Sequence, residues 1–190
     1  TFMTSPAKEA VKASFLKLLE ERPLREITVT DIVRDCGINR NSFYYHFKDI
    51  PALLEEIITD YASRIIAAQG PSPSLADCLE TAAAFALEHR QAMLHINQSA
   101  HRDLFELCLM DICRQVVRKY AAAAFGGVPI RQEDREIIVR FYQCECFGQI
   151  IEWLNSGMRY DIGGQFRRLC LLGEGMTEML LKRALAHDGD

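Results

Sequence analysis

Polar and aromatic side chains gather between residues 40 and 48, where the sequence reads RNSFYYHFK. Arginine can pair bidentately with guanine and asparagine with adenine, so Arg40 and Asn41 have the chemistry of base recognition. Hydroxyl groups and cations bind phosphate oxygens, a role open to Tyr44 and Lys48. Three consecutive polar-tipped rings cannot all face one core, so part of this segment is expected to face outward.

The elements that would present these residues are two short helices around a glycine. Thr28 or Thr30 can cap the first helix, which Gly37 ends, and Asn39 can cap a second helix over 40–46. Helices of about seven residues are unstable alone, so both must pack on the helix before them. This is the layout of a helix-turn-helix, whose second helix enters the major groove of DNA.

Apolar residues of the same region fit a small core. Phe43 and Phe47 are four residues apart and share one face of the second helix. They are expected to pack with four other apolar residues, which are Phe15, Leu19, Ile32 and Ile38. A helical corner with its tyrosines packed against the next helix is the alternative that this pattern leaves open.

Helical periodicity continues along the chain, and no segment has the pattern of a strand. Ser5 and Pro6 are suited to begin the first helix, and Asp49 and Pro51 to begin the fourth. The segment QGPSPS, residues 69–74, should end that helix. The expected long helices span 6–21, 51–69, 75–95, 100–125, 131–156 and 165–186.

Composition bounds the class of protein. The 190 residues are 49% apolar and 25% charged, which is typical of a globular chain with a substantial core. No apolar run is long enough to cross a bilayer and no signal peptide is evident, so a cytoplasmic location is expected. Met3 is the expected native start, with Thr1 and Phe2 left from cloning.

Charge is unevenly distributed. The net charge of −4 does not by itself suggest a nucleic-acid partner. Residues 1–50, however, carry eight basic and seven acidic side chains, whereas the rest of the chain carries fourteen basic and nineteen acidic side chains. This modest asymmetry permits a nucleic-acid face near the N-terminus.

Seven cysteines occur without a CxxC pair. We expect them to be small buried residues in a reducing cytoplasm, with a redox switch as the alternative. Cys144 and Cys146 are two residues apart and point to different faces of a helix, so no metal site is expected. The seven are Cys36, Cys78, Cys108, Cys113, Cys144, Cys146 and Cys170.

The segment ITVTDIVRDCGINRNSFYYHFKDIPALLEEI, residues 27–57, closely resembles the DNA-binding segment of TetR-family transcriptional regulators. The matching positions are Thr28, Asp31, Ile32, Cys36, Gly37, Phe43, Tyr44 and Phe47. The resemblance implies base contacts near Arg40, Asn41 and Tyr45. It implies phosphate contacts from Thr28 or Thr30, Tyr44, His46 and Lys48. The Ser42 hydroxyl has the chemistry to bind a phosphate as well. One position departs from the family, because Ile50 stands where a phosphate-binding lysine is usual.

The same resemblance implies a larger helical domain over 74–187 that binds a small-molecule effector and forms the dimer. It follows a DNA-binding domain over 5–50 and a connecting helix over 51–69. The expected pocket is mostly apolar. Its candidate residues are Phe85, Met93, His95, Phe105, Leu109, Phe141 and Cys144, with Asn97, His101 and Gln143 as further polar candidates.

Glycines within the last two expected helices point to close packing. A glycine inside a helix costs about 1 kcal/mol relative to alanine, and it persists where backbones approach closely. In the family the last two helices form the homodimer contact. Its candidate residues are Gly148, Ile151, Phe166, Leu169, Gly173, Met176 and Leu180. The segment FGQIIEWLNSGM, residues 147–158, is also similar to regulators of the dihydroxyacetone-kinase type.

The sequence thus predicts an all-α, ligand-responsive repressor that binds a palindromic operator as a homodimer. A TetR-like co-regulator that acts through a protein partner is the alternative, favoured by Ile50. An enzyme is not expected, since the chain has no Glu-x-x-His pair, G-x-S-x-G, P-loop or H-E-x-x-H. No cofactor is expected.

Overall fold

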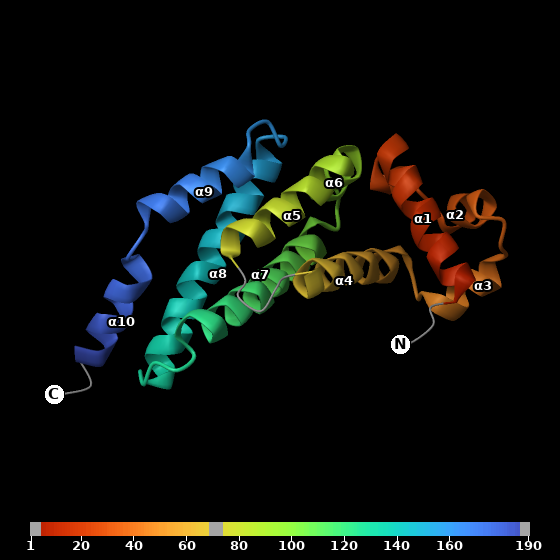
Figure 1. The fold of residues 1–190 in the computed structure, drawn as a ribbon. Coiled ribbons are helices and arrows are strands. Elements are labelled where there is room, and N and C mark those ends of the chain that lie inside the picture. Colours follow the sequence, from red (N-terminus) through yellow and green to blue (C-terminus); the bar gives the residue numbers. More distant parts are fainter. Residues whose placement is uncertain (1–4, 69–73, 187–190) are drawn as a thin grey trace. The chain divides into compact units, whose positions relative to one another are not determined.

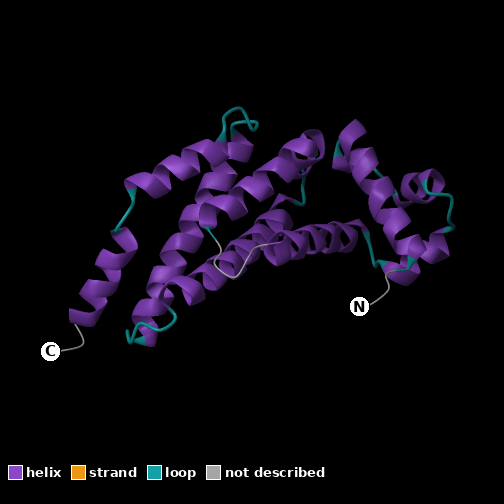
Figure 2. Ribbon diagram, viewed as in Figure 1, coloured by secondary structure: helices purple, strands orange, loops and turns teal. Residues whose placement is uncertain are grey.

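A computed structural model describes residues 5–68 and 74–186, which form helices joined by loops, without a strand in those two ranges (Figures 1 and 2). The all-α fold predicted from the sequence is confirmed. The helices near the N-terminus are α1 (Pro6–Glu21), η1 (Leu24–Glu26), α2 (Val29–Asp35), α3 (Arg40–His46) and α4 (Ile50–Ala68). Those that follow are α5 (Leu75–Glu88), α6 (Arg90–Asn97), α7 (Arg102–Phe125), α8 (Gln132–Asn155), α9 (Ile162–Leu172) and α10 (Met176–Ala186).

The chain divides into two compact units. The N-terminal unit contains the chain up to Ala62 together with Ala86–Cys108. The C-terminal unit contains Ser63–Phe85 and the chain from Leu109 onward. The division falls inside α4, α5 and α7, so each of these helices begins in one unit and ends in the other.

Helix α1 is the centre of the N-terminal unit. Its Phe15 and Leu19 are fully buried, as are Ile32 of α2 and Phe43 of α3. The buried Ser14 hydroxyl donates to the Ile32 carbonyl at 3.2 Å, which satisfies one carbonyl of α2. These contacts hold the two short helices on α1, as their length requires.

Two histidines, one at the start of α6 and one within it, contact the C-terminal end of α1. The Nδ1 atom of His95 donates to the Leu19 carbonyl at 2.6 Å, one of the carbonyls that a helix end leaves without a partner. The Nδ1 atom of His89 lies 3.3 Å from a Glu20 carboxylate oxygen. Helix α6 therefore packs in the same unit as α1.

In the C-terminal unit, Trp153 closes the turn between α8 and α9. Its indole N–H donates to the Tyr160 carbonyl at 2.9 Å, and the side chain is almost fully buried. Glu80 of α5 forms an ion pair with Arg167 of α9. A Cβ at Gly163 would lie 2.9 Å from the Glu80 side chain, so this glycine lets α5 and α9 approach.

Two expected helices are each divided. The predicted 75–95 helix is wrong, because the chain breaks at His89 between α5 and α6. No glycine or proline marks this break, which accompanies the contact between His89 and Glu20. The predicted 165–186 helix is also wrong: Gly173 caps the end of α9, and Gly175 has φ +79° in the turn before α10.

Smaller differences concern helix ends. Ser5 precedes α1, but its side chain makes no capping hydrogen bond and only its backbone carbonyl accepts from Lys8 and Glu9. The short helix η1 was not expected. The start expected at Met3, and all but the last residue of the 69–74 break, lie outside the described residues.

Two features of residues 5–68 and 74–186 bear on the class of function. None of their helices is both long and apolar enough to cross a membrane. In the same residues, no group of three or more His, Cys, Asp or Glu side chains is placed to hold a metal ion.

Candidate nucleic-acid interface

Helix α2 begins with a complete capping box. The Thr28 hydroxyl accepts from the Asp31 backbone N–H at 3.2 Å, and the Asp31 carboxylate accepts from the Thr28 backbone N–H at 3.0 Å. The Thr28 hydroxyl also donates to that carboxylate at 2.6 Å. Its proton is therefore engaged within the chain, whereas Thr30 lies in the first turn of α2 and is half-buried.

Arg22 supports the capping box, a role that the sequence did not indicate. Its Nη2 atom lies 3.4 Å from the Asp31 carboxylate. The pKa of Asp31 is lowered, first by the hydrogen bond from the Thr28 side chain and then by that from its backbone, with Arg22 contributing less. The box therefore holds a carboxylate that stays ionised at neutral pH.

Gly37 and Asn39 set the direction of α3. Gly37 has φ +70°, a left-handed conformation that side chains with a Cβ adopt only at a cost. The Asn39 side chain then accepts from the Ser42 backbone N–H at 2.9 Å and caps α3. Both roles agree with the sequence prediction.

Helix α3 has one buried face. Phe43 is fully buried, and Phe47 directly after the helix is 3% exposed. Their rings lie 5.7 Å apart between centroids, and the Lys8 ammonium lies over the Phe47 ring. The predicted core of the helix-turn-helix is thus present.

The other face of α3 carries the predicted base-contacting residues. Tyr45 is 84% exposed and Tyr44 is 52% exposed, while Arg40 and Asn41 are also exposed. The rings of Tyr45 and His46 meet edge to face, with centroids 5.0 Å apart. The tyrosines therefore do not pack into a helical corner, and their hydroxyl ends face outward.

The cations at the two ends of α3 differ from those of α1. Arg40 and Lys48 are exposed, and neither forms an ion pair with a residue in the described ranges. Lys17 of α1, by contrast, contacts the Asp35 carboxylate at 2.5 Å, and this contact is the first cause of the lowered pKa of Asp35. Ile50, which stands where the family usually has a lysine, is the first residue of α4, and Lys48 precedes it by two residues in the sequence.

Comparison with known proteins identifies the family of this fold. Residues 16–57 match the family model described as "Bacterial regulatory proteins, tetR family". Residues 74–169, about half of the chain, match that described as "Transcriptional regulator C-terminal region". The chain belongs to the TetR family. TetR-family proteins are DNA-binding transcriptional regulators and not enzymes, which is the class that the sequence predicts.

Individual relatives of this TetR-family chain are distant. The "Uncharacterized HTH-type transcriptional regulator YxbF" of Bacillus subtilis is 22% identical over 162 residues, covering 81% of this chain and 41% of that protein. The "HTH-type transcriptional repressor KstR2" of Mycolicibacterium smegmatis is 31% identical over 102 residues, covering 50% of this chain and 49% of that protein. The chain therefore matches less than half the length of either curated relative.

A solved structure shares the fold over almost the whole chain. The "Dihydroxyacetone kinase operon activator DhaS" superposes with a TM-score of 0.70, covering 95% of this chain and 97% of its own, at 15% sequence identity. At that identity the likeness shows the TetR-family fold and nothing finer.

The predicted effector-pocket residues of this TetR-family chain belong to two units. Three of them, Met93, His95 and Phe105, lie in the N-terminal unit, where His95 is engaged with α1. Phe85, Leu109, Phe141 and Cys144 lie in the C-terminal unit. Leu109 is buried, whereas Phe141 is 50% exposed and Cys144 is exposed. The polar candidates divide in the same way: Asn97 and His101 lie in the N-terminal unit and Gln143 in the C-terminal unit.

The predicted dimer residues also differ in exposure. Phe166 is 5% exposed and therefore packs within its own chain, whereas Leu169 is 40% exposed. Gly148 is exposed inside α8, and a Cβ there would meet nothing within 4 Å. Gly173, at the end of α9, does not lie inside a helix. The remaining three, Ile151, Met176 and Leu180, are half-buried.

One face of α8 carries exposed residues that are apolar or small. Ile137 is 57% exposed and Phe141 is 50% exposed. With Cys144 and Gly148 they recur at spacings of four, three and four residues, which places all four on one side of the helix. We call these four residues the α8 stripe.

The cysteines are all unbridged, and three of the seven are buried. Burial raises the pKa of Cys113 and of Cys146 to about 12, so these thiols stay protonated at neutral pH. Cys144 and Cys170 are exposed, contrary to the expectation of burial.

Proposed function

We propose that this TetR-family chain is a dimeric repressor that reads duplex DNA through α3 and responds to a small molecule. The observation that carries the proposal is the division of α3 into two faces. Phe43 and Phe47 are buried, and Arg40, Asn41 and Tyr45 face outward. An arginine and an asparagine at the start of a recognition helix suit guanine and adenine in the major groove.

Phosphate contacts would hold this helix in the groove. Lys48 and the Tyr44 hydroxyl are exposed beside the reading residues, and His46 and Ser42 lie on the same helix. Thr30 is a better candidate than Thr28, since the Thr28 hydroxyl is engaged with Asp31. Such contacts position a protein on DNA without reading its sequence.

Dimerisation would use the α8 stripe. An exposed apolar row on a long helix is costly in water and is a usual site of association. A two-fold axis through it would give two recognition helices, one for each half of a palindromic operator. On this view Phe141 and Cys144 belong to the dimer contact and not to the pocket.

The effector would bind among the buried apolar side chains of the C-terminal unit. Phe85 and Leu109 remain candidate pocket residues, because both belong to that unit and neither is fully exposed. A ligand that binds the folded chain raises its unfolding temperature with ligand concentration, so a thermal-shift screen of small apolar compounds can find it. The relatives' names leave the direction of regulation to experiment, since KstR2 is called a repressor and DhaS an activator.

The decisive experiment is binding to duplex DNA from the region upstream of the chain's own gene. Wild type would be compared with Arg40→Ala and Tyr44→Ala, across a salt series and against an unrelated duplex. Arg168→Ala removes a cation from an exposed position of α9 and is the matched control. Selective, salt-sensitive binding that both α3 variants lose would support direct recognition of DNA through α3. Equal weak binding to both duplexes, unchanged by the substitutions, would instead favour a co-regulator with a protein partner, as Ile50 suggests.

A further inference from the structure

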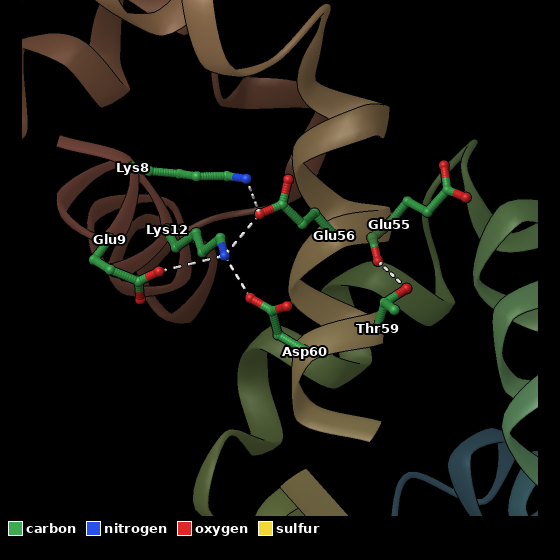
Figure 3. A network of polar contacts seen from close by, with 7 residues as sticks. All are labelled: Lys8, Glu9, Lys12, Glu55, Glu56, Thr59 and Asp60. Atoms are coloured by element: carbon green, nitrogen blue, oxygen red, sulfur yellow. Dashed lines mark hydrogen bonds and ion pairs between the residues drawn. The ribbon is translucent and has the colours of Figure 1, made fainter. Parts of the chain in front are cut away.

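Two lysines of α1 meet two carboxylates of α4 (Figure 3). Lys8 and Lys12 are one helical turn apart, and so are Glu56 and Asp60. The same Glu56 oxygen lies 2.7 Å from the Lys8 ammonium and 2.8 Å from that of Lys12. Lys12 also contacts the Asp60 carboxylate. We call these four residues the lysine ladder.

Lys12 is the buried member of the lysine ladder. Its side chain is only 8% exposed, whereas those of Glu56 and Asp60 are 30% and 40% exposed. A third carboxylate, Glu9, lies 3.5 Å from its ammonium. Burial alone lowers the pKa of Lys12, but the hydrogen bonds that its ammonium donates to Asp60 and Glu56 outweigh burial, and the pKa is raised. Lys12 is therefore a buried ammonium that stays charged.

Stability alone is a weak explanation for such a residue. Apolar side chains of similar size often replace a buried ion pair without loss of stability. Ionic contacts instead select one alignment, because a shift of α4 along α1 would leave buried charges unpaired. Two cations one turn apart that face two anions one turn apart define one register.

The register of α4 matters because α3 is joined to it directly. Only residues 47–49 separate the end of α3 at His46 from the start of α4 at Ile50. Phe47, in this link, is buried in the core of the unit. A displacement of α4 on α1 would therefore change how α3 is held.

We propose that Lys12 is a positioning residue for DNA recognition, which holds α4 in one register on α1 and so fixes the orientation of α3. This inference rests on the proposed function of α3.

The test compares Lys12→Met with wild type in the full chain. Methionine keeps an unbranched stem of similar length but has no charge, and the half-exposed Asp60 remains free to be hydrated. We expect selective affinity for the upstream duplex to fall by roughly tenfold, comparable with losing one good base contact. Because buried Lys12 cannot reach a phosphate, the dependence of affinity on salt should stay unchanged. Lys12→Arg should restore most of the affinity, and Lys182→Met, which removes a charge from an exposed site, is the control.

Hydrogen exchange without DNA separates this inference from the proposed function. Lys12→Met should raise the exchange rates of amides in residues 50–60 by roughly tenfold, with α5 and α8 unchanged. Unchanged exchange there, or selective affinity within about twofold of wild type, would overturn the proposal. If wild type itself shows no selective DNA binding, the proposed function fails and exchange alone decides the role of Lys12. Glu56→Gln keeps the side chain's shape and serves if Lys12→Met does not fold.

Discussion

Arg40 and Lys48 both carry a positive charge near α3, but they should do different work on DNA. For an arginine that reads a guanine, Arg40→Ala should cost about 1–3 kcal/mol on the selected duplex and relax selectivity. Lys48→Ala should weaken binding to every duplex alike and reduce the slope of log affinity against log salt by about one. Fluorescence anisotropy across a salt series measures both quantities. Equal changes of slope in the two variants would show that Arg40 binds only phosphate.

Glycine is favoured at position 37 because of the backbone conformation there, and not because a side chain would lack space. Its φ is +70°, while a Cβ there would meet nothing within 4 Å. Gly37→Ala should therefore lower the free energy of unfolding by about 1–2 kcal/mol, the usual cost of a left-handed residue. Gly127→Ala is the control, since its Cβ also meets nothing within 4 Å and its φ is not positive. Chemical denaturation measures the free energy of unfolding of both variants. Equal losses in Gly37→Ala and Gly127→Ala would contradict a role for the left-handed backbone at Gly37.

At the scale of one element, the capping box makes the stability of α2 depend on pH. Folding lowers the pKa of Asp31. The ionised Asp31 side chain therefore stabilises the folded chain above its pKa in the unfolded state, and this stabilisation is lost as the pH falls through its pKa in the folded state. Asp31→Asn should therefore lower the urea midpoint at pH 7. The difference in urea midpoint between Asp31→Asn and wild type should shrink as the pH falls below 3.8, the ordinary pKa of this carboxyl group. Glu174→Gln, at an exposed turn, should show no such dependence, and a gap that persists at low pH would argue against the capping charge.

Helices with local signals could be predicted from the sequence almost to the residue. Pro6, Thr28 and Asn39 mark the starts of α1, α2 and α3, and Gly37 separates the last two. The break at His89 has no such signal, because the ring contacts Glu20, which lies 69 residues earlier in the chain. Local sequence cannot encode a break that depends on a distant partner.

The residues of the candidate interface could likewise be predicted only where the spacing of residues within one helix decides which side chains face outward. The outward residues of α3 follow from the spacing of Phe43 and Phe47, which fixes the buried face. The partners of Lys12 could not be predicted, since Asp60 is 48 residues away and meets it only when α4 packs on α1. Thr28 looked like a phosphate contact, but its hydroxyl is engaged by the capping box. Residue type indicated the chemistry, and tertiary contacts decided which groups remain available.

At the scale of the whole molecule, the α8 stripe is an apolar row that packing within the described chain leaves exposed. Ile137 and Phe141 are each at least half exposed on a helix whose other face is buried through Val139 and Trp153. Folding of one chain leaves about half of each of these two side chains in water, whereas association would bury the rest. In the proposed dimer, a second copy of the chain would cover the α8 stripe and would also supply a second recognition helix.

A substitution at Gly148 should affect the stability of one chain and the stability of the proposed dimer in opposite directions. Glycine inside a helix is about 0.8–1 kcal/mol less favourable than alanine, and leucine ranks just below alanine. Because the site is open, Gly148→Leu should stabilise the single chain. The same leucine would prop two α8 stripes apart and weaken the dimer. We therefore expect sedimentation velocity to show a shift from dimer to monomer, while circular dichroism shows unchanged helix content. Gln91→Leu places the same side chain on an exposed site of α6 and should leave the mass unchanged. A Gly148→Leu variant that remains fully dimeric would exclude α8 as the centre of the contact. The exposed Leu169, Leu171 and Leu172 of α9 would become the next surface to test.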